Sequence, residues 1–481
     1  MTIVHRLLTT GHEDRVYIVG MVPSVAICEQ ALAARDPRFD GVFFVGITST
    51  RVYCRPICPS RRANSAHRRF FGTAAAAEHE GFRPCLRCRP ELAPGRARVD
   101  AVSRLARTAT DRIAAGALNG RGVSRLARDL GVGERHLRRA VERTTGVSPL
   151  ALAQTHRLLM ATRLLADTAL PITQIAFASG FQSLRRFNSV FRERYRLSPT
   201  AVRGVERKRV KPNDLVRLTL GFRQPLAWDV LTAILGHAAL PGVELVDHGQ
   251  YRRTVRLDGR CGVVFVTNDS KRTGKAHLAV DLSLSLVPVT MPLLARLRRL
   301  FDLDAEPTVV DSHLEQGGLA DLVARRPGIR VPGALDGFEV ALGLLLRSGP
   351  PDLARAVVAE FGEWFATETP ELTRLAPSAE SLAEAGPSPL CALGASPALA
   401  HVIVELARAV TDGRLTLEPG ADVEATRRTL GAIEGMDPCI SSGILMRALA
   451  WPDEFPGSDT RAERWRPWRA YAALHVWLRD T

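Results

Sequence analysis

Two short stretches decide the fold of the N-terminal part of the chain: Val52-Tyr53-Cys54-Arg55-Pro56-Ile57-Cys58 and Arg83-Pro84-Cys85-Leu86-Arg87-Cys88. They form a C-x3-C pair and a C-x2-C pair with 26 residues between them. Short spacing lets both sulfurs of each pair face one point, so the two pairs can supply four thiolates to one tetrahedral zinc ion. We therefore predict one zinc ion per chain, held by Cys54, Cys58, Cys85 and Cys88. A purely structural zinc knuckle is the alternative that this spacing leaves open.

The distribution of charge separates the two halves of the chain. The 481 residues are 46% hydrophobic and 24% charged, which is typical of a globular protein of several domains. Residues 1–206 contain 33 Lys and Arg against 16 Asp and Glu, whereas the remainder contains 32 against 34. This imbalance predicts nucleic-acid binding by the first half. We find no apolar run of membrane-spanning length and no signal peptide, so we expect a cytoplasmic protein with no membrane partner.

The residues around the cysteines point to a family. Phe39-Asp40-Gly41 through Thr50, Val52 through Pro56, and Gly81-Phe82-Arg83-Pro84 through Pro90 resemble the N-terminal domain of the Ada DNA-repair proteins over residues 24–92. The resemblance implies that Cys54 accepts a methyl group from a DNA methylphosphotriester and that Cys58, Cys85 and Cys88 complete the zinc site. It also implies that Thr50 and Arg61 lie near the phosphate. Arg51 stands where the family usually has glycine.

This chemistry is consistent with the residue types. Zinc keeps thiols as thiolates at neutral pH, and a thiolate is the nucleophile that can take a methyl group from a phosphate oxygen. The thioether product has no easy exit, so we expect a single turnover. Four thiolates on Zn²⁺ carry a formal charge of about −2, and methylation leaves about −1. We expect this change to raise the affinity for DNA.

Two helix-turn-helix units follow the cysteines. Residues 123–132 and 175–181 each predict an amphipathic helix that ends at a glycine turn, and a polar or basic helix comes next. The second helix of such a unit lies in the major groove. The candidate DNA contacts are Arg135, His136, Arg138, Arg139, Gln182, Ser183, Arg185, Arg186 and Asn188.

This helical stretch resembles the DNA-binding domain of the AraC family over residues 99–204. The carriers are the I-A-x-x-x-G-F-x-S string at 175–183, Phe187, Phe191 and Ser198-Pro199. Arg196 replaces the family's usual glycine before Ser-Pro. The resemblance implies a transcriptional activator that binds promoter operator DNA and has RNA polymerase as a partner.

The second half begins with strand-like runs at 216–222, 251–257, 262–266 and 276–282, with a helix pattern at 228–235, and is helical from 291 onward. It resembles the AlkA-type 3-methyladenine DNA glycosylases over residues 213–481. The most specific carrier is Arg464-Trp465-Arg466-Pro467-Trp468-Arg469-x-Tyr471-Ala472-x-x-His475-x-Trp477. The resemblance implies that Asp459 is the catalytic carboxylate and that Trp477 lies beside a flipped base.

Several departures from that family predict weak base excision. Residues 347–351, which are polar and broken by proline, stand where the family inserts a wedge into DNA. Glu434 and Asp437 put carboxylates in the helix-hairpin-helix turn that normally holds a phosphate. Cys439 and Gly443 replace aromatic residues near the base, and only five residues separate Asp459 from Trp465.

The sequence as a whole predicts a multidomain α+β protein. We expect an extension at 1–23, a small zinc-bound α/β domain at 24–92, an all-α double helix-turn-helix domain at 99–204, an α+β sheet domain at 213–290 and an all-α helix-hairpin-helix domain at 291–481. The predicted function is a single-turnover DNA methylphosphotriester–cysteine S-methyltransferase and transcriptional activator, with a glycosylase-like half that has lost much of its activity. Two alternatives remain: a fully bifunctional activator and 3-methyladenine glycosylase, or a transcription factor with a purely structural zinc site.

Overall fold

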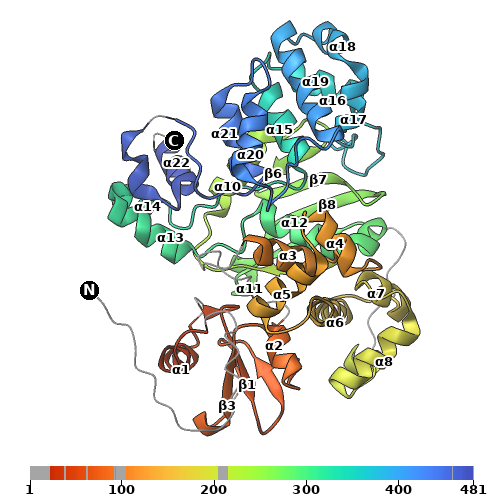
Figure 1. The fold of residues 1–481 in the computed structure, drawn as a ribbon, viewed down its shortest axis with the longest axis vertical. Coiled ribbons are helices and arrows are strands. Elements are labelled where there is room, and N and C mark those ends of the chain that lie inside the picture. The colour runs from red at the N-terminus through yellow and green to blue at the C-terminus, as the bar shows by residue number, and fades with distance from the viewer. Residues whose placement is uncertain are drawn as a thin grey trace.

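The computed structural model describes residues 22–36, 39–60, 63–90, 93, 104–203, 215–457 and 459–479. Arg61, most of the expected N-terminal extension, and residues 94–98 and 206–212 between the expected domains lie outside the described residues. Within the described parts the chain forms the predicted multidomain α+β structure (Figure 1). None of the described helices is both long and apolar enough to cross a membrane.

The first part, residues 22–93, is called the cysteine domain below. A four-stranded sheet of order β3-β1-β2-β4 packs with two helices. Phe44, Tyr53, Phe71 and Phe82 fill its core. Its elements are α1 (Val25–Ala34), β1 (Phe44–Ile47), β2 (Val52–Cys54), β3 (Arg68–Phe71), α2 (Ala74–His79) and β4 (Arg83–Pro84), with a 3-10 turn at Ser65–His67. The apolar run at 42–47 supplies β1, which begins at Phe44.

Two arginines that replace a family glycine keep the glycine backbone conformation. Arg51 has φ +55° and Arg196 has φ +60°, both in the left-handed region. For a residue with a Cβ this conformation costs about 1–2 kcal/mol. Contacts offset the cost at Arg51, because its guanidinium lies 4.9 Å from the Phe82 ring centre and donates to the Glu80 carbonyl at 3.0 Å. Both arginines therefore adopt the left-handed backbone that a glycine would adopt without this cost.

The helical part, residues 104–203, contains both predicted helix-turn-helix units. The helices are α3 (Arg104–Ala114), α4 (Val123–Asp129), α5 (Glu134–Thr145), α6 (Pro149–Asp167), α7 (Ile172–Ala178), α8 (Leu184–Tyr195) and α9 (Pro199–Arg203). Gly131 and Gly180 make the two turns with φ +66° and +85°. The 19-residue helix α6 joins the units. Its length of about 28 Å sets the distance between them.

The sheet part begins the second half with a five-stranded antiparallel sheet of order β5-β9-β8-β7-β6. Its elements are β5 (Val216–Gly221), α10 (Trp228–Ala238), β6 (Glu244–Asp247), β7 (Gln250–Leu257), β8 (Arg260–Asn268), α11 (Ser270–Thr273) and β9 (His277–Leu282), followed by a 3-10 turn at Leu284–Val289. The four predicted strands and the predicted helix are present. Strand β6 was not predicted, because all four of its residues are half-buried and show no alternation.

The remainder is helical, as predicted. Its elements are α12 (Thr290–Leu300), α13 (Pro307–Leu314), a π-type turn at Glu315–Leu319, α14 (Ala320–Arg325), α15 (Gly337–Leu346), α16 (Leu353–Phe361), α17 (Ala379–Ala385), α18 (Pro387–Ala392), α19 (Pro397–Thr411), α20 (Val423–Gly431), α21 (Pro438–Arg447), a 3-10 turn at Thr460–Trp465 and α22 (Arg469–Trp477). Helices α20 and α21 form the hairpin in which the sequence placed Glu434 and Asp437.

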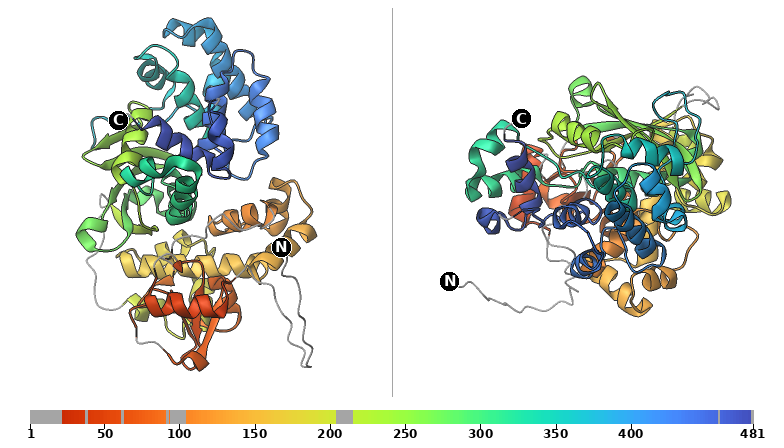
Figure 2. Two further views of the ribbon diagram at one scale, coloured as in Figure 1. Left: turned by 90° about the vertical axis from the view of Figure 1, so that its left-hand side faces the viewer. Right: turned by 90° about the horizontal axis from the view of Figure 1, so that it is seen from above.

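The two halves pack directly against each other. One hydrophobic core includes Leu158 of α6, Phe187 of α8 and Val280 of β9. Arg223, after β5, donates to the Asp40 carbonyl of the cysteine domain at 2.9 Å. Figure 2 shows α6 lying between the cysteine domain and the sheet of the second half. The helix-turn-helix part is thus held from both sides.

Candidate metal centre and nucleic-acid interface

The sheet brings the two cysteine pairs together. Strands β2 and β4 run parallel, with Tyr53 opposite Pro84, so the cysteine after each of these residues leaves the sheet at the same edge. The Cys85 amide donates to the Tyr53 carbonyl at 3.0 Å. The four sulfurs, of Cys54, Cys58, Cys85 and Cys88, lie within 4.8 Å of one another. A tetrahedral zinc with sulfurs at 2.3 Å needs sulfurs about 3.8 Å apart, so the cluster fits one ion.

The chemistry of the donor set also calls for a cation. All four cysteines are free thiols, and Cys54, Cys58 and Cys88 are buried. Without a cation, hydrogen bonding with Cys58, then with the other two thiols and burial, raises the pKa of Cys54 well above its ordinary value. Four thiolates so close together repel one another unless a divalent cation lies between them.

The sulfurs differ in their hydrogen bonds. The Arg55 amide donates to Cys88 Sγ at 3.4 Å. Among the residues that the structure describes, Cys54 contacts the other three thiols but no such N–H or O–H group. A hydrogen bond to a thiolate stabilises its charge and weakens it as a nucleophile. The Cys88 sulfur is therefore a weaker nucleophile than a thiolate that accepts no such bond.

Arg55 fixes the loop between Cys54 and Cys58. Its guanidinium binds both carboxylate oxygens of the buried Asp40, with Nε 2.8 Å from Oδ1. The same guanidinium donates to the Cys88 carbonyl at 3.2 Å. Neither Arg55 nor Asp40 was assigned a role from the sequence. The available signal was an arginine directly after a ligand, but its carboxylate partner lies 15 residues earlier.

The residues expected near the phosphate are less closely grouped. Thr50 is exposed in the turn between β1 and β2, at the opposite end of β2 from Cys54. Arg61 lies outside the described residues. Arg87, exposed between Cys85 and Cys88, is a cation at the cluster that the sequence analysis did not single out.

The helix-turn-helix candidates are mostly accessible. Arg135, His136 and Arg139 on α5 are exposed, whereas Arg138 is half-buried and pairs with Glu134 one turn earlier at 2.6 Å.

In the second unit, Gln182, Ser183, Arg185 and Arg186 are exposed and Asn188 is half-buried. The Ser183 hydroxyl caps α8 by accepting from the Arg186 amide at 3.4 Å. Exposed cations on the second helix of each unit can reach DNA phosphates or bases.

Asp459 lies in a local ion pair. Its carboxylate accepts from the Arg461 amide at 2.8 Å and binds the Arg461 guanidinium, with Nη2 at 2.8 Å from Oδ2. The hydrogen bond with Arg461 lowers the pKa of Asp459, so the carboxylate is ionised but neutralised by its neighbour. Trp477 is 50% exposed at the end of α22.

The hairpin turn between α20 and α21 is occupied by its own carboxylate. Asp437 Oδ1 accepts from the amides of Cys439 at 2.7 Å and Ile440 at 3.1 Å. These amides are the donors that a helix N-terminus offers to a phosphate. Glu434 is exposed in the same turn and adds a second negative charge.

One hollow of the second half is lined by Met446, Trp451, Trp468 and Tyr471 among others. Trp468 and Tyr471, which the sequence analysis left without a site role, both pack in the core and form part of this wall.

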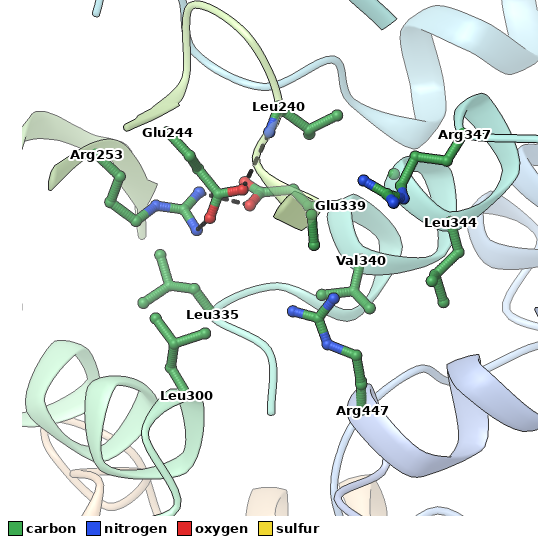
Figure 3. A pocket seen from close by; sticks show the side chains of 12 residues that line it. Leu240, Glu244, Arg253, Leu300, Leu335, Glu339, Val340, Leu344, Arg347 and Arg447 are labelled. Atoms are coloured by element: carbon green, nitrogen blue, oxygen red, sulfur yellow. Dashed lines mark hydrogen bonds and ion pairs between the residues drawn. The ribbon is translucent and has the colours of Figure 1, made fainter. Parts of the chain in front are cut away.

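A second hollow of this half holds a charged network (Figure 3). Arg253 binds Glu244 at 3.0 Å and Glu339 at 2.5 Å, while Arg347 and Arg447 reach in from α15 and α21. Burial raises the pKa of Glu339 to about 7. Glu339 thus ties α15 to the sheet through Arg253 of β7.

Comparisons with known proteins agree with this division of the chain. Residues 27–91 match the metal-binding domain of Ada, residues 126–204 a helix-turn-helix domain, and residues 217–336 the AlkA N-terminal domain.

Three curated relatives cover different lengths of the chain. The probable bifunctional transcriptional activator/DNA repair enzyme AlkA of Mycobacterium tuberculosis is 36% identical over 94% of this chain and 95% of its own length. DNA-3-methyladenine glycosylase 2 of Escherichia coli is 33% identical over 54% of this chain and 97% of its own. The bifunctional transcriptional activator/DNA repair enzyme Ada of E. coli is 33% identical over 27% and 35%.

These matches define a fusion of an Ada-type metal-binding domain, a helix-turn-helix domain and an AlkA-type half. The chain belongs to the family of the bifunctional transcriptional activator/DNA repair enzymes AlkA, with which it aligns over nearly its whole length. The metal of the four-cysteine cluster is zinc.

Proposed function

We propose that the chain is a DNA alkylation-response protein in which Cys54 takes a methyl group from a DNA methylphosphotriester and the methylated protein activates transcription of repair genes. The observation that carries this proposal is the convergence of four cysteine sulfurs within 4.8 Å of one another. Among the residues that the structure describes, the Arg55 amide donates to Cys88 Sγ, whereas Cys54 contacts only the other three thiols. Cys54 is the sulfur at which the Ada resemblance puts the methyl acceptor.

In this proposal Cys54, Cys58, Cys85 and Cys88 are the zinc ligands. Bound zinc keeps the sulfurs deprotonated at neutral pH. The Cys54 sulfur attacks the methyl carbon, an S–C bond forms, and the bond from that carbon to the phosphate oxygen breaks. The electron pair stays on the phosphate, which leaves as an ordinary phosphodiester anion. Because the S-methyl thioether is stable, each protein acts once.

DNA binding by the first half supplies both the substrate and the readout. The exposed side chains Arg135, His136 and Arg139 of α5, with Arg185 and Arg186 of α8, are proposed to contact operator DNA, as are Arg138, Gln182, Ser183 and Asn188. Thr50 and Arg61 are proposed to contact the methylated strand. Activation implies contact with RNA polymerase, and we place the protein in the cytoplasm with its DNA.

The charge of the cluster provides the switch. Methylation removes about one negative charge from a surface that must approach phosphates. Loss of the repulsion between this charge and the DNA phosphates should strengthen binding most at low salt, because salt screens the repulsion at high concentration. Methylated protein should therefore bind operator DNA more tightly than unmethylated protein, with a difference that shrinks as salt rises.

We also propose that the glycosylase-like half retains little base-excision activity. Asp437 satisfies the helix N-terminus that would hold a DNA phosphate, and Arg461 neutralises Asp459. Trp477, the proposed wall of the base pocket, is half-exposed. An excising enzyme must hold the backbone, flip the base and stabilise the cationic sugar, and each of these parts is altered here.

The test is to mix the zinc-loaded full-length protein with duplex DNA that carries methylphosphotriesters and to map the methyl group by peptide mass. We expect one methyl on Cys54. Cys54→Ala should accept none, whereas Cys439→Ser, which changes an exposed thiol of the second half, should react as the wild type does. A methyl on another cysteine, or none on any, would overturn the assignment.

A further inference from the structure

A buried carboxylate lies where the cysteine domain meets the helix-turn-helix part. Glu78 of α2 is 2% exposed, and it is a rare kind of side chain to find inside a protein. Its Oε1 accepts from the hydroxyl of Tyr53 at 3.1 Å, and its Oε2 accepts from the hydroxyl of Thr155 at 3.0 Å. Each carboxylate oxygen therefore contacts a different domain.

A third contact reaches the second helix of the second unit. Arg194, near the end of α8, donates to the Glu78 backbone carbonyl at 2.6 Å, and its Nε lies 3.9 Å from Glu78 Oε2. Helix α8 carries Arg185 and Arg186 at its other end, about 13 Å away along a rigid helix. One residue of the cysteine domain thus touches both α6 and α8.

Within the cysteine domain, the partner of Glu78 is Tyr53, which is the neighbour of the proposed methyl acceptor Cys54. Tyr53 is fully buried and directly precedes Cys54 in β2. A second link lies beyond the other cysteine pair, where Arg89, next to Cys88, binds Asp167 of α6 at 2.5 Å. Both ends of the cluster are therefore fastened to the helix that joins the two units.

We propose that Glu78 couples the cysteine cluster to the helix-turn-helix units, so that methylation of Cys54 changes how α6 and α8 are held and not only the charge that DNA meets. This inference rests on the proposed methyl transfer. It adds a mechanical path, Cys54 to Tyr53 to Glu78 to Thr155 and Arg194, to the electrostatic switch. In this path Glu78 is a positioning residue.

Packing makes this path responsive. Cys54 is 8% exposed and packs with Leu32 and Val45 in a small apolar cluster. A methyl group added to a buried sulfur needs new volume, and a neutral thioether binds a cation more weakly than a thiolate. Because protein interiors are close-packed, β2 must shift to make room. Tyr53 moves with β2, and its hydrogen bond carries the shift to Glu78.

The test separates coupling from chemistry with variants on the helix-turn-helix side only. Thr155→Val removes the hydroxyl that Glu78 accepts from, and Thr155→Ser restores it. Arg194→Ala removes the third contact, and Arg192→Ala, an exposed arginine of the same helix, is its charge-matched control. Each full-length zinc-loaded protein is methylated on methylphosphotriester DNA. Both forms are then titrated against a duplex selected from a random-sequence pool by the methylated wild type.

The measured quantity is the ratio of the affinities of the methylated and unmethylated forms for the duplex. A variant that only loses positive charge weakens both forms by the same factor, so this ratio stays the same. We expect Thr155→Val and Arg194→Ala to lower this ratio by about threefold to tenfold, the value of one buried hydrogen bond. Thr155→Ser and Arg192→Ala should keep it. The extent of Cys54 methylation should be the same in all variants.

Hydrogen exchange distinguishes coupling from a contact that only stabilises the fold, because only coupling makes the protection of α8 depend on methylation. Methylation of the wild type should change the protection of α8 amides, and Thr155→Val should abolish that change. If every protein is methylated and Thr155→Val and Arg194→Ala keep the wild-type ratio, the coupling is wrong while the methyl transfer stands. If no protein is methylated at Cys54, the proposed function fails first.

Discussion

The buried carboxylate of Glu78 should make the stability of the N-terminal half depend on pH. Burial raises the pKa of Glu78 to about 7 from an ordinary value of 4.5, although Arg194, Thr155 and Tyr53 act in the opposite direction. The folded protein therefore keeps a proton that the unfolded chain releases between these two values. The stabilisation from this proton is complete below pH 4.5 and is lost as the pH rises through about 7.

The size of the effect follows from the difference in pKa. Each unit corresponds to about 1.4 kcal/mol, so the shift of Glu78 is worth on the order of 3 kcal/mol. Glu78→Gln cannot ionise. The free energy needed to open the interface should therefore fall between pH 5 and pH 8 in the wild type but not in Glu78→Gln. The difference between the two proteins should change by up to that amount in favour of Glu78→Gln.

The assay must be local, because the chain has several domains and Glu339 in the second half also has a pKa raised to about 7. Hydrogen exchange of α2 and α6 amides reports the opening of this interface alone. Glu80→Gln, at an exposed carboxylate two residues away, is the matched control and should behave as the wild type does. The same pH dependence in Glu78→Gln and in the wild type would refute the reasoning.

Three further outcomes are expected. The purified protein should contain one zinc ion per chain, and Cys58→Ser should lose it on dialysis against a chelator; a metal-free wild type under reducing conditions would contradict the site. Arg139→Ala removes an exposed cation, so it should weaken operator binding and lower the slope of log affinity against log salt concentration by about one. Arg138→Ala removes a cation that is already paired with Glu134, so both effects should be smaller. Equal losses in the two variants, measured by binding at several salt concentrations, would show that the Arg138–Glu134 pair opens on DNA. The full-length protein and Asp459→Asn should both release little 3-methyladenine from methylated DNA; fast release by the wild type, lost in Asp459→Asn, would establish a working glycosylase.

The sequence was sufficient for the elements whose signals are local. Each cysteine pair lies within four residues, and each helix-turn-helix unit is an amphipathic pattern with a glycine turn, so the cluster and helices α4, α5, α7 and α8 could be predicted. The sequence also put the Asp437 carboxylate in the hairpin turn, and the structure shows that it caps α21 there. Periodicity also located four of the five strands of the second half.

The tertiary structure decided what depends on distant partners. Strand β6 has no pattern of its own and exists because β7 offers hydrogen bonds to its edge. Arg55 is held by Asp40, and Arg223, which lies just after β5 and 183 residues later than Asp40, donates to the carbonyl of Asp40.

Glu78 is the clearest case of this dependence on distant partners. In the sequence it is one acidic residue in a short alanine-rich helix, with nothing to distinguish it from a solvated side chain. Its burial follows from contacts with Thr155 and Arg194, which lie 77 and 116 residues away. Local patterns specify helices, turns and metal ligands because short-range geometry determines them, but whether a carboxylate is buried and what it binds are set only when separate domains pack together.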